Sequence, residues 1–127
     1  MSNNQDTTDK NSKFDLEDRT LKFSKKLISV LSGLPKATVN FTLVPQGLRS
    51  GTSVGANYRE ANGASSKKDF QNKIFICKKE SKETLYWLEL IGKAIDDDKQ
   101  KDDCRKLWKE AKELTLIFSK IASSTKV

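Results

Sequence analysis

The sequence has no histidine, and its 127 residues include only two cysteines, Cys77 and Cys104. Without histidine, a Ser-His-Asp or Cys-His nucleophilic site is excluded, and the commonest metal ligand and general base is missing. Two cysteines so far apart form neither a disulfide framework nor a CxxC motif. Cys77 lies in the apolar run IFIC and is expected to be buried, whereas Cys104 lies among charged residues and is expected to be exposed in a reducing cytosol.

Long hydrophobic runs are missing as well. The first 13 residues are polar and carry no signal-peptide core, and no segment approaches the roughly 20 apolar residues that span a membrane. These features predict a soluble, cytoplasmic protein. Residues 1–13 are predicted to be a disordered tail, and residues 14–127 are predicted to form one domain.

The charge balance is basic. Lysine and arginine number 24 against 17 acidic residues, which gives a net charge of +7 and a pI near 9.4. Charged residues make up 32% of the chain and hydrophobic residues 35%, a balance typical of amphipathic helices with solvated outer faces. The basic excess favours a polyanionic partner, although lysines also serve solubility.

Apolar residues recur at helical spacing in four segments, residues 15–32, 39–61, 67–95 and 99–123. Short polar connections separate them, with Gly33 and Pro35 in the first. Ser65 or Ser66 is predicted to cap the third helix, Asp98 the fourth, and Thr38 or Asn40 the second. The pattern predicts an all-α fold, an antiparallel up-down four-helix bundle.

The second predicted helix contains Pro45 and three glycines spaced four residues apart: Gly47, Gly51 and Gly55. Each glycine costs a helix about 1 kcal/mol, so the segment needs close packing to be helical. Glycines on one face form a smooth groove, for which residues 67–95 are a plausible neighbour. The apolar surface of residues 67–95 is broad, and one side of it is predicted to face a second subunit.

Two carboxylates, Glu60 and Glu83, are candidates for acid–base or metal chemistry, and with Asp69 they could serve a metal-dependent nuclease. The favoured interpretation is a structural polar cluster with Arg49 and Asn57, because buried carboxylates are costly without partners. We therefore predict no catalytic residue, no metal site, no cofactor and no enzymatic activity.

The basic residues carry the functional hypothesis, which is contact with the phosphates of RNA or DNA. The candidate nucleic-acid-binding residues are Arg59, Lys67, Lys68, Lys78, Lys82, Arg105 and Lys109. The alternative is a solvated lysine face on an oligomeric scaffold that docks a protein partner. Trp87, Trp108 and Tyr86 could stack on bases, but their helical spacing favours a place in the core or in a subunit interface.

Two stretches, SGTSVGANYREANGASSKKDF and KESKETLYWLELI, carry a resemblance to a known family. They resemble the four-helix-bundle proteins encoded in intervening sequences of bacterial 23S ribosomal RNA genes, and the resemblance extends from Leu21 to the C-terminus. It implies a ring-like homopentamer and no established activity. The related accessory variability protein of diversity-generating retroelements binds nucleic acid and a reverse transcriptase, but this sequence is more similar to the ribosomal-RNA branch. The sequence thus predicts a non-enzymatic, homo-oligomeric protein that binds nucleic acid.

Overall fold

The computed structural model describes the backbone of residues 4–125 and the side chains of residues 15–37 and 39–125. This part of the chain contains no strand. It forms four helices: α1 (Asn4–Ser32), α2 (Thr38–Asn62), α3 (Lys67–Lys93) and α4 (Asp98–Ser124). The prediction of an all-α four-helix bundle is confirmed. None of these helices has a segment long and apolar enough to cross a membrane.

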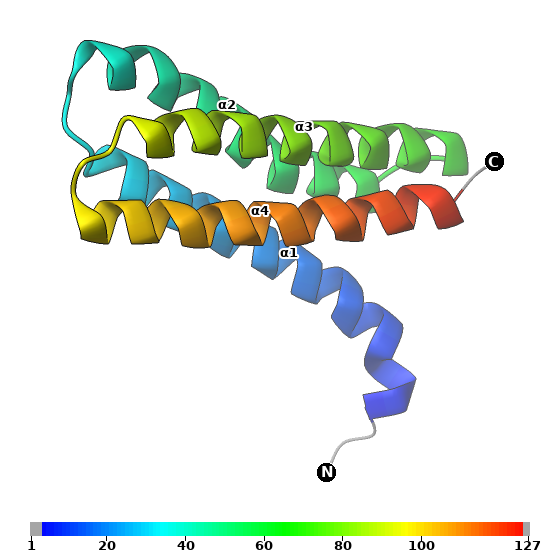
Figure 1. Ribbon diagram of the computed structural model, residues 1–127. Helices are drawn as coiled ribbons and strands as arrows, with labels where there is room; N and C mark the ends of the chain where they lie inside the picture. The colour runs from blue at the N-terminus through cyan, green and yellow to red at the C-terminus, as the bar shows by residue number, and fades with distance from the viewer. Residues whose placement is uncertain (1–3, 126–127) are drawn as a thin grey trace.

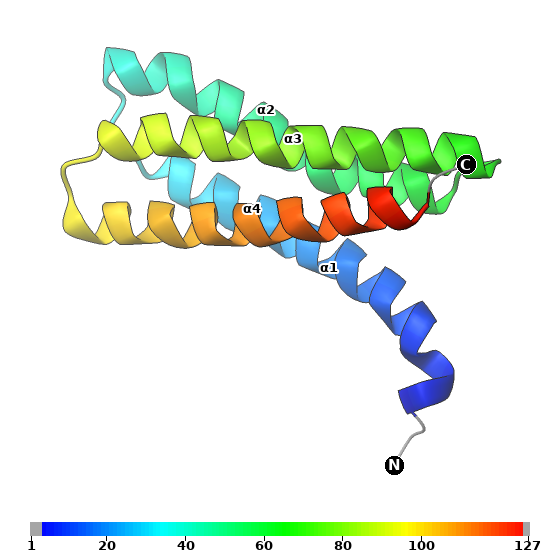
Figure 2. The same ribbon diagram turned by 45° about the vertical axis from the view of Figure 1, so that its right-hand side comes forward.

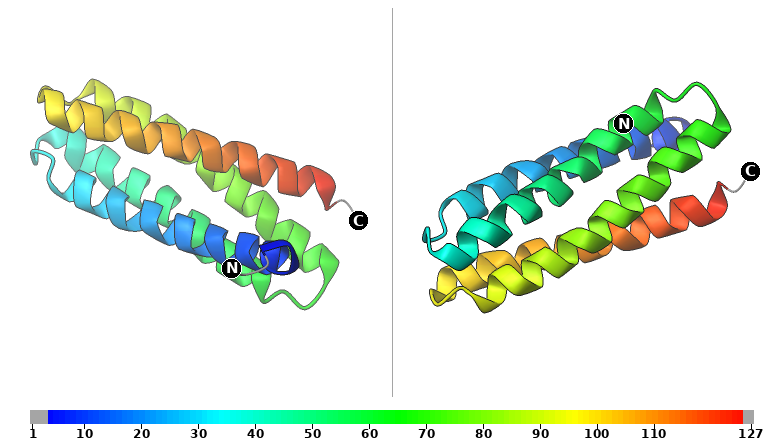
Figure 3. Two further views of the ribbon diagram at one scale, coloured as in Figure 1. Left: turned by 90° about the horizontal axis from the view of Figure 1, so that it is seen from below. Right: turned by 90° about the horizontal axis from the view of Figure 1, so that it is seen from above.

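The helices lie in two layers. Figure 1 shows connections at alternate ends of the molecule, so each helix runs back along the one before it. Helices α3 and α4 form the layer that faces the viewer, and α1 and α2 form the layer behind, as both views of Figure 3 show. Every pair of sequence neighbours packs together, and α1 also contacts α4, more sparsely.

The start of α1 lies within the predicted disordered tail. The helix begins at Asn4, so residues 4–13 are helical, and Figures 1 and 2 show its first turns leaving the other three helices. No proline or glycine occurs between Asn4 and Ser32, so nothing in the sequence stops the helix at residue 14. The rest of the predicted tail, residues 1–3, and the last two residues of the predicted domain, 126–127, lie outside the described part.

Helix α2 is continuous through Pro45, as predicted. Two of its three glycines face α1 rather than the expected α3. A Cβ atom placed on Gly55 would lie 3.1 Å from the hydroxyl of Thr20, and one on Gly51 would meet Leu27. Gly51 directly follows Ser50, which faces α3. Because one residue turns a helix by about 100°, Gly51 and Gly55 point to α1 instead. The α1 and α2 backbones therefore approach closely.

The contact between α2 and α3 uses small polar residues. Ser50 and Thr84 are fully buried, and the hydroxyl of Thr84 donates to that of Ser50 over 2.9 Å. The predicted apolar stripe of α3 faces this contact and the core, with Cys77 buried as expected and its thiol directed at the carbonyl of Val54. Burial raises the pKa of the Cys77 thiol to about 12.

Ion pairs join α1 to α4. The guanidinium of Arg19 donates two hydrogen bonds to Glu110, over 2.6 and 2.8 Å, and one to Glu113 over 2.9 Å. These hydrogen bonds, that to Glu110 above all, raise the pKa of Arg19. The pairing is half-exposed, so solvent screens it.

Two of the three predicted helix caps need correction. Asp97, not Asp98, caps α4, and its carboxylate accepts from the backbone N–H of Gln100. Neither Thr38 nor Asn40 caps α2; Ala37 occupies that position and makes no side-chain cap. Ser66 caps α3, one of the two residues proposed for that place.

Cys104 is buried rather than exposed. A Cβ placed on Gly92 of α3 would lie 3.7 Å from its sulfur, an ordinary contact, so the thiol rests against α3 at this residue. The thiol is directed at the carbonyl of Leu88. The polar neighbours of Cys104 in sequence point outward, because the buried face of α4 continues three residues later at Leu107.

Candidate nucleic-acid interface

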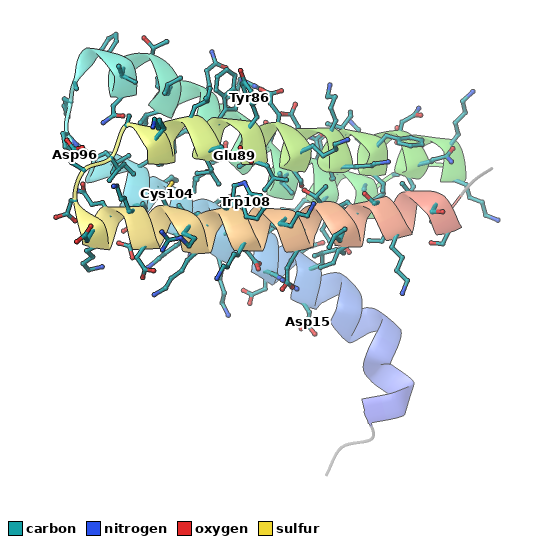
Figure 4. All side chains as sticks on the ribbon, in the orientation of Figure 1. Asp15, Tyr86, Glu89, Asp96, Cys104 and Trp108 are labelled. Atoms are coloured by element: carbon teal, nitrogen blue, oxygen red, sulfur yellow. The ribbon has the colours of Figure 1, made fainter. Side chains whose placement is uncertain are left out.

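One hydrogen bond between side chains spans the outer seam between α3 and α4. The indole Nε1 of Trp108 donates to Oε1 of Glu89 over 3.2 Å, and Figure 4 shows both residues where the two helices adjoin. Trp108 is half-buried and packs against the hydrophobic core, as predicted. A depression of about 380 Å³ adjoins the pair, and its lining includes Gly92, Lys101 and Arg105.

Basic side chains follow both sides of this seam at helical spacing. On α3, Lys78 and Lys82 precede Glu89 by eleven and seven residues, so all three lie on one face. On α4, Lys101 and Arg105 lie seven and three residues before Trp108, and Lys112 lies four residues after it. Lys109, which follows Trp108 directly, is exposed. We call these six basic residues the seam face: Lys78, Lys82, Lys101, Arg105, Lys109 and Lys112.

The positive charge of the seam face is largely uncompensated. The carboxylates of Glu89 and Asp102 adjoin it, and Glu113, which pairs with Arg19, lies one turn after Lys109. Asp102 contacts Arg105 only at 3.5 Å, with both side chains exposed. Within the described side chains, the other five cations of the seam face form no ion pair. Mobile, solvated ammonium groups of this kind suit phosphates as point charges, without selecting a base sequence.

Three of the seven predicted nucleic-acid residues lie away from the seam face. Arg59 follows Gly55 by one turn and so lies on the side of α2 that packs on α1. Lys67 lines a separate cavity of about 1030 Å³, at the end of the bundle where α1 diverges. Lys68 is exposed near the start of α3. The other four, Lys78, Lys82, Arg105 and Lys109, lie together on the seam face.

Sequence reasoning missed some basic and aromatic residues of this surface. Lys101 was not predicted, although its spacing of seven from Trp108 places it on the seam. Phe75 belongs to the broad apolar surface of the third helix and Tyr86 was predicted to lie in the core or in a subunit interface; within the single chain their side chains are 47% and 58% exposed. Their helical phase shows why: Tyr86 lies nine residues, two and a half turns, from buried Cys77, and so on the opposite side of α3.

The predicted polar cluster is divided in two. Arg49 donates to Glu80 over 3.3 Å and also pairs with Glu83, as the favoured interpretation proposed. Glu83 in turn accepts a hydrogen bond of 2.8 Å from the indole of Trp87. Glu80 is almost buried and was missed, although it lies within the buried stripe, three residues after Cys77.

Glu60 and Asn57 lie elsewhere along the α2–α3 contact. Glu60 accepts from Lys73 over 2.7 Å, a hydrogen bond that raises the pKa of Lys73, and Asn57 donates to the backbone carbonyl of Ser53. The division follows from helix direction. Because α3 runs back along α2, the end of α2 meets the start of α3, and Arg49 meets its middle.

The three carboxylates considered for nuclease chemistry lie apart. Glu60 pairs with Lys73 and Glu83 with Arg49, while Asp69 lies in the first turn of α3. Between residues 15 and 125, no group of three or more acidic or cysteine side chains is arranged to hold a metal ion.

Comparison with known proteins identifies relatives of the whole bundle. The model of a family described as 23S rRNA-intervening sequence protein matches residues 12–120. Among solved structures, the chain resembles a protein with unknown function from the S23 ribosomal protein family of Bacteroides thetaiotaomicron. The two share 33% sequence identity and a TM-score of 0.76, over 87% of this chain and 97% of that one. No curated protein matches the chain. Neither description names a reaction.

Proposed function

Because the chain belongs to the 23S rRNA-intervening sequence protein family, we propose a binding role without catalysis. The protein contacts RNA or DNA through the phosphates, using the seam face. It discriminates little between sequences, because phosphate contacts position a nucleic acid and base contacts specify it. This role places the protein in the cytoplasm, where it meets nucleic acid.

The observation that supports this role is the convergence of basic residues from two helices. Residues such as Lys82 and Lys109 are 27 positions apart in the chain, yet helices α3 and α4 bring them to one surface. Among the described side chains, five of the six cations form no ion pair. Each phosphate that such a surface neutralises releases counterions, so the affinity falls steeply with salt.

The proposal includes self-association, as a pentamer by family resemblance. In its support, apolar side chains are exposed on the layer opposite the seam face. They are Leu21 and Ile28 on α1, 37% and 48% exposed, and Val39 and Phe41 on α2, 53% and 81% exposed. A ring of copies would present several seam faces to one nucleic acid, which multiplies a weak affinity. Light scattering in dilute solution tests this part, and a lone subunit would contradict it.

A charge-matched pair of variants tests the nucleic-acid role. The seam variant replaces Lys78, Lys82, Arg105 and Lys109 by glutamine. The control variant makes the same change at four lysines of the other layer: Lys22, Lys25, Lys26 and Lys36. Both variants lose four positive charges, so any effect of net charge alone is equal.

Binding of a fluorescent RNA hairpin is measured by anisotropy between about 50 and 200 mM salt. The seam variant is expected to bind at least tenfold more weakly, with a salt slope shallower by about 0.9 for each phosphate that the variant no longer neutralises. The control is expected to stay within about threefold of the unmodified protein. Equal losses in both variants, or no binding by the unmodified protein at about 50 mM salt, would contradict the proposal.

A protein-docking scaffold is the second candidate, and the 81% exposure of Phe41 favours it. A nearly free phenyl ring at the start of α2 is a typical anchor for a protein interface. The distinguishing result is a stoichiometric protein partner that survives nuclease treatment and is lost in Phe41→Ser.

A further inference from the structure

We infer that the outward face of α3 binds an unpaired strand of nucleic acid, with bases stacked on Phe75 and Tyr86 and phosphates held by the lysines between them. This inference rests on the proposed function, which requires only phosphate contacts. It adds the type of nucleic acid, single-stranded rather than duplex, and the side chains that distinguish the two.

The two rings and their flanking lysines follow one line along α3. Lys79 and Lys82 lie four and seven residues after Phe75, and seven and four before Tyr86. Residues at these steps share one face of a helix, so each ring has a lysine one turn away. The rings are eleven residues apart, which is about 16 Å along the helix axis. We call these four residues the stacking stripe.

The stripe is exposed, and its surroundings are basic. Phe75 and Tyr86 are 47% and 58% exposed, an unusual state for large rings in a bundle whose core holds other aromatics. Lys68 and Lys93 continue the line at both ends, each seven residues beyond a ring. A polyanion that offers planar apolar groups is the partner that matches alternating cations and rings.

The ring of Tyr86 is held in place by its neighbour Trp87. It lies edge-on to Trp87, with ring centroids 5.0 Å apart and an interplanar angle of 71°. Trp87 is itself fixed, because its indole donates to Glu83, and Glu83 is paired with Arg49. Figure 4 shows Tyr86 projecting away from α4. A ring that already rests against a fixed neighbour loses little entropy when a base stacks on it.

Unpaired bases fit this stripe better than the alternatives. In a duplex the base faces are covered by their neighbours, so they cannot reach a protein ring. A second copy of the chain in a symmetric contact would bring Lys79 and Lys82 against the same lysines of its partner, which is repulsive. Two acidic groups of α3 lie one turn from Tyr86, and both are engaged: Glu83 by Arg49 and Trp87, and Glu89 by the indole of Trp108.

The test compares two apolar substitutions at Tyr86 that differ in aromatic character, Tyr86→Phe and Tyr86→Leu. The probes are a 12-nucleotide uridine RNA and a blunt RNA duplex of the same strand length, each labelled for anisotropy. We expect Tyr86→Phe to bind the single strand as the unmodified protein does, because stacking needs the ring and not the hydroxyl. We expect Tyr86→Leu and Phe75→Leu each to lose about fivefold or more. Duplex binding should change by less than about twofold in all of them.

Spectroscopy gives an independent readout. In Tyr86→Trp, the single strand should quench and shift the emission of the new indole on stacking, and the duplex should leave it unchanged. Single-strand binding that is equal in Tyr86→Phe and Tyr86→Leu, while salt-dependent binding persists, would overturn this inference and leave the proposed function intact. A smaller assembly in solution for Tyr86→Leu than for the unmodified protein, measured by light scattering, would also overturn it, because the stripe would then be an interface between copies. Absence of any nucleic-acid binding by the unmodified protein would overturn both.

Discussion

The close approach of α1 and α2 leads to a prediction about stability. An alanine at Gly51 would place its methyl carbon within 3.0 Å of Cδ2 of Leu27, closer than real Cβ atoms come. Leu27 has no exposed surface and cannot move into solvent. The methyl group must therefore displace either the Leu27 side chain from its rotamer or the whole of α1.

Two opposing contributions determine how much Gly51→Ala changes the free energy of unfolding. Alanine in a helix is favoured over glycine by about 1 kcal/mol. Overpacking a tight core costs about 1–3 kcal/mol. Gly51→Ala is thus expected to lower the free energy of unfolding by up to about 2 kcal/mol, which corresponds to a fall in Tm of up to about 8 °C for a domain of this size.

Urea and thermal denaturation, followed by circular dichroism at one protein concentration, measure this change. The matched control is Gly63→Ala, because a Cβ there would be 3.8 Å from the nearest atom outside its immediate neighbours, an ordinary contact. The control should be neutral or slightly stabilising. In the double variant Gly51→Ala/Leu27→Ala the new methyl occupies vacated space, so the destabilisation should be smaller than the sum for the two single variants. A stabilised Gly51→Ala, or strict additivity in the double variant, would refute the reasoning.

Three further outcomes are expected. Burial raises the pKa of Cys77 to about 12, so the stability due to its protonated thiol is complete below the ordinary thiol pKa and is lost as pH rises towards 12; urea titrations from pH 8 upward should show a flatter decline in Cys77→Ala. Arg49→Met removes the ionic partner of nearly buried Glu80 and should lower the free energy of unfolding by about 1–3 kcal/mol at pH 7, and adding Glu80→Gln should restore most of this loss. Urea denaturation measures both variants, and equal midpoints for the single and the double variant would contradict the prediction. Gly92→Ala should be neutral or stabilising by up to about 1 kcal/mol, because its Cβ meets only the sulfur of Cys104, at an ordinary 3.7 Å; a fall in Tm would contradict this expectation.

Periodicity in the sequence predicted the fold well where one helix face is consistently apolar. The buried stripe of α3, which includes Ile74, Cys77 and Leu88, is readable because burial repeats every three or four residues. The Ser66 cap was readable for a similar local reason, since a serine precedes the apolar run and Asp69 follows three residues later.

Features that depend on which helices are neighbours were not predictable from one helix at a time. The side of α2 that carries Gly51 could face either α1 or α3, and only the packing of all four helices decides it. Burial of Cys104 depends on its contact with α3, at Leu88 and Gly92, which belong to a different helix. The start of α1 at Asn4 could not be predicted, because the first residues of the helix show no apolar periodicity.

The candidate site was half predictable for the same reason. The lysines were visible as charges, but their convergence on one seam requires the pairing of α3 with α4. The sequence signal that identifies Tyr86 as exposed is its phase relative to Cys77, a criterion that separates surface rings from core rings when an apolar face is unusually broad. Phe75 lies two residues before Cys77, about 200° around the helix, and the same criterion places it on the surface as well.

The unequal attachment of α1 determines how this molecule should come apart. On one side α1 rests on bare glycine backbone, and on the other it is joined to α4 by the Arg19 ion pairs, which salt screens and acid neutralises. We expect amide protons of α1 to exchange before those of α3, which packs more extensively on both of its neighbours. Partial opening would then leave three helices in place and uncover the apolar surface on which Phe23, Leu27 and Leu31 of α1 pack, giving a species prone to exchange its first helix with another copy.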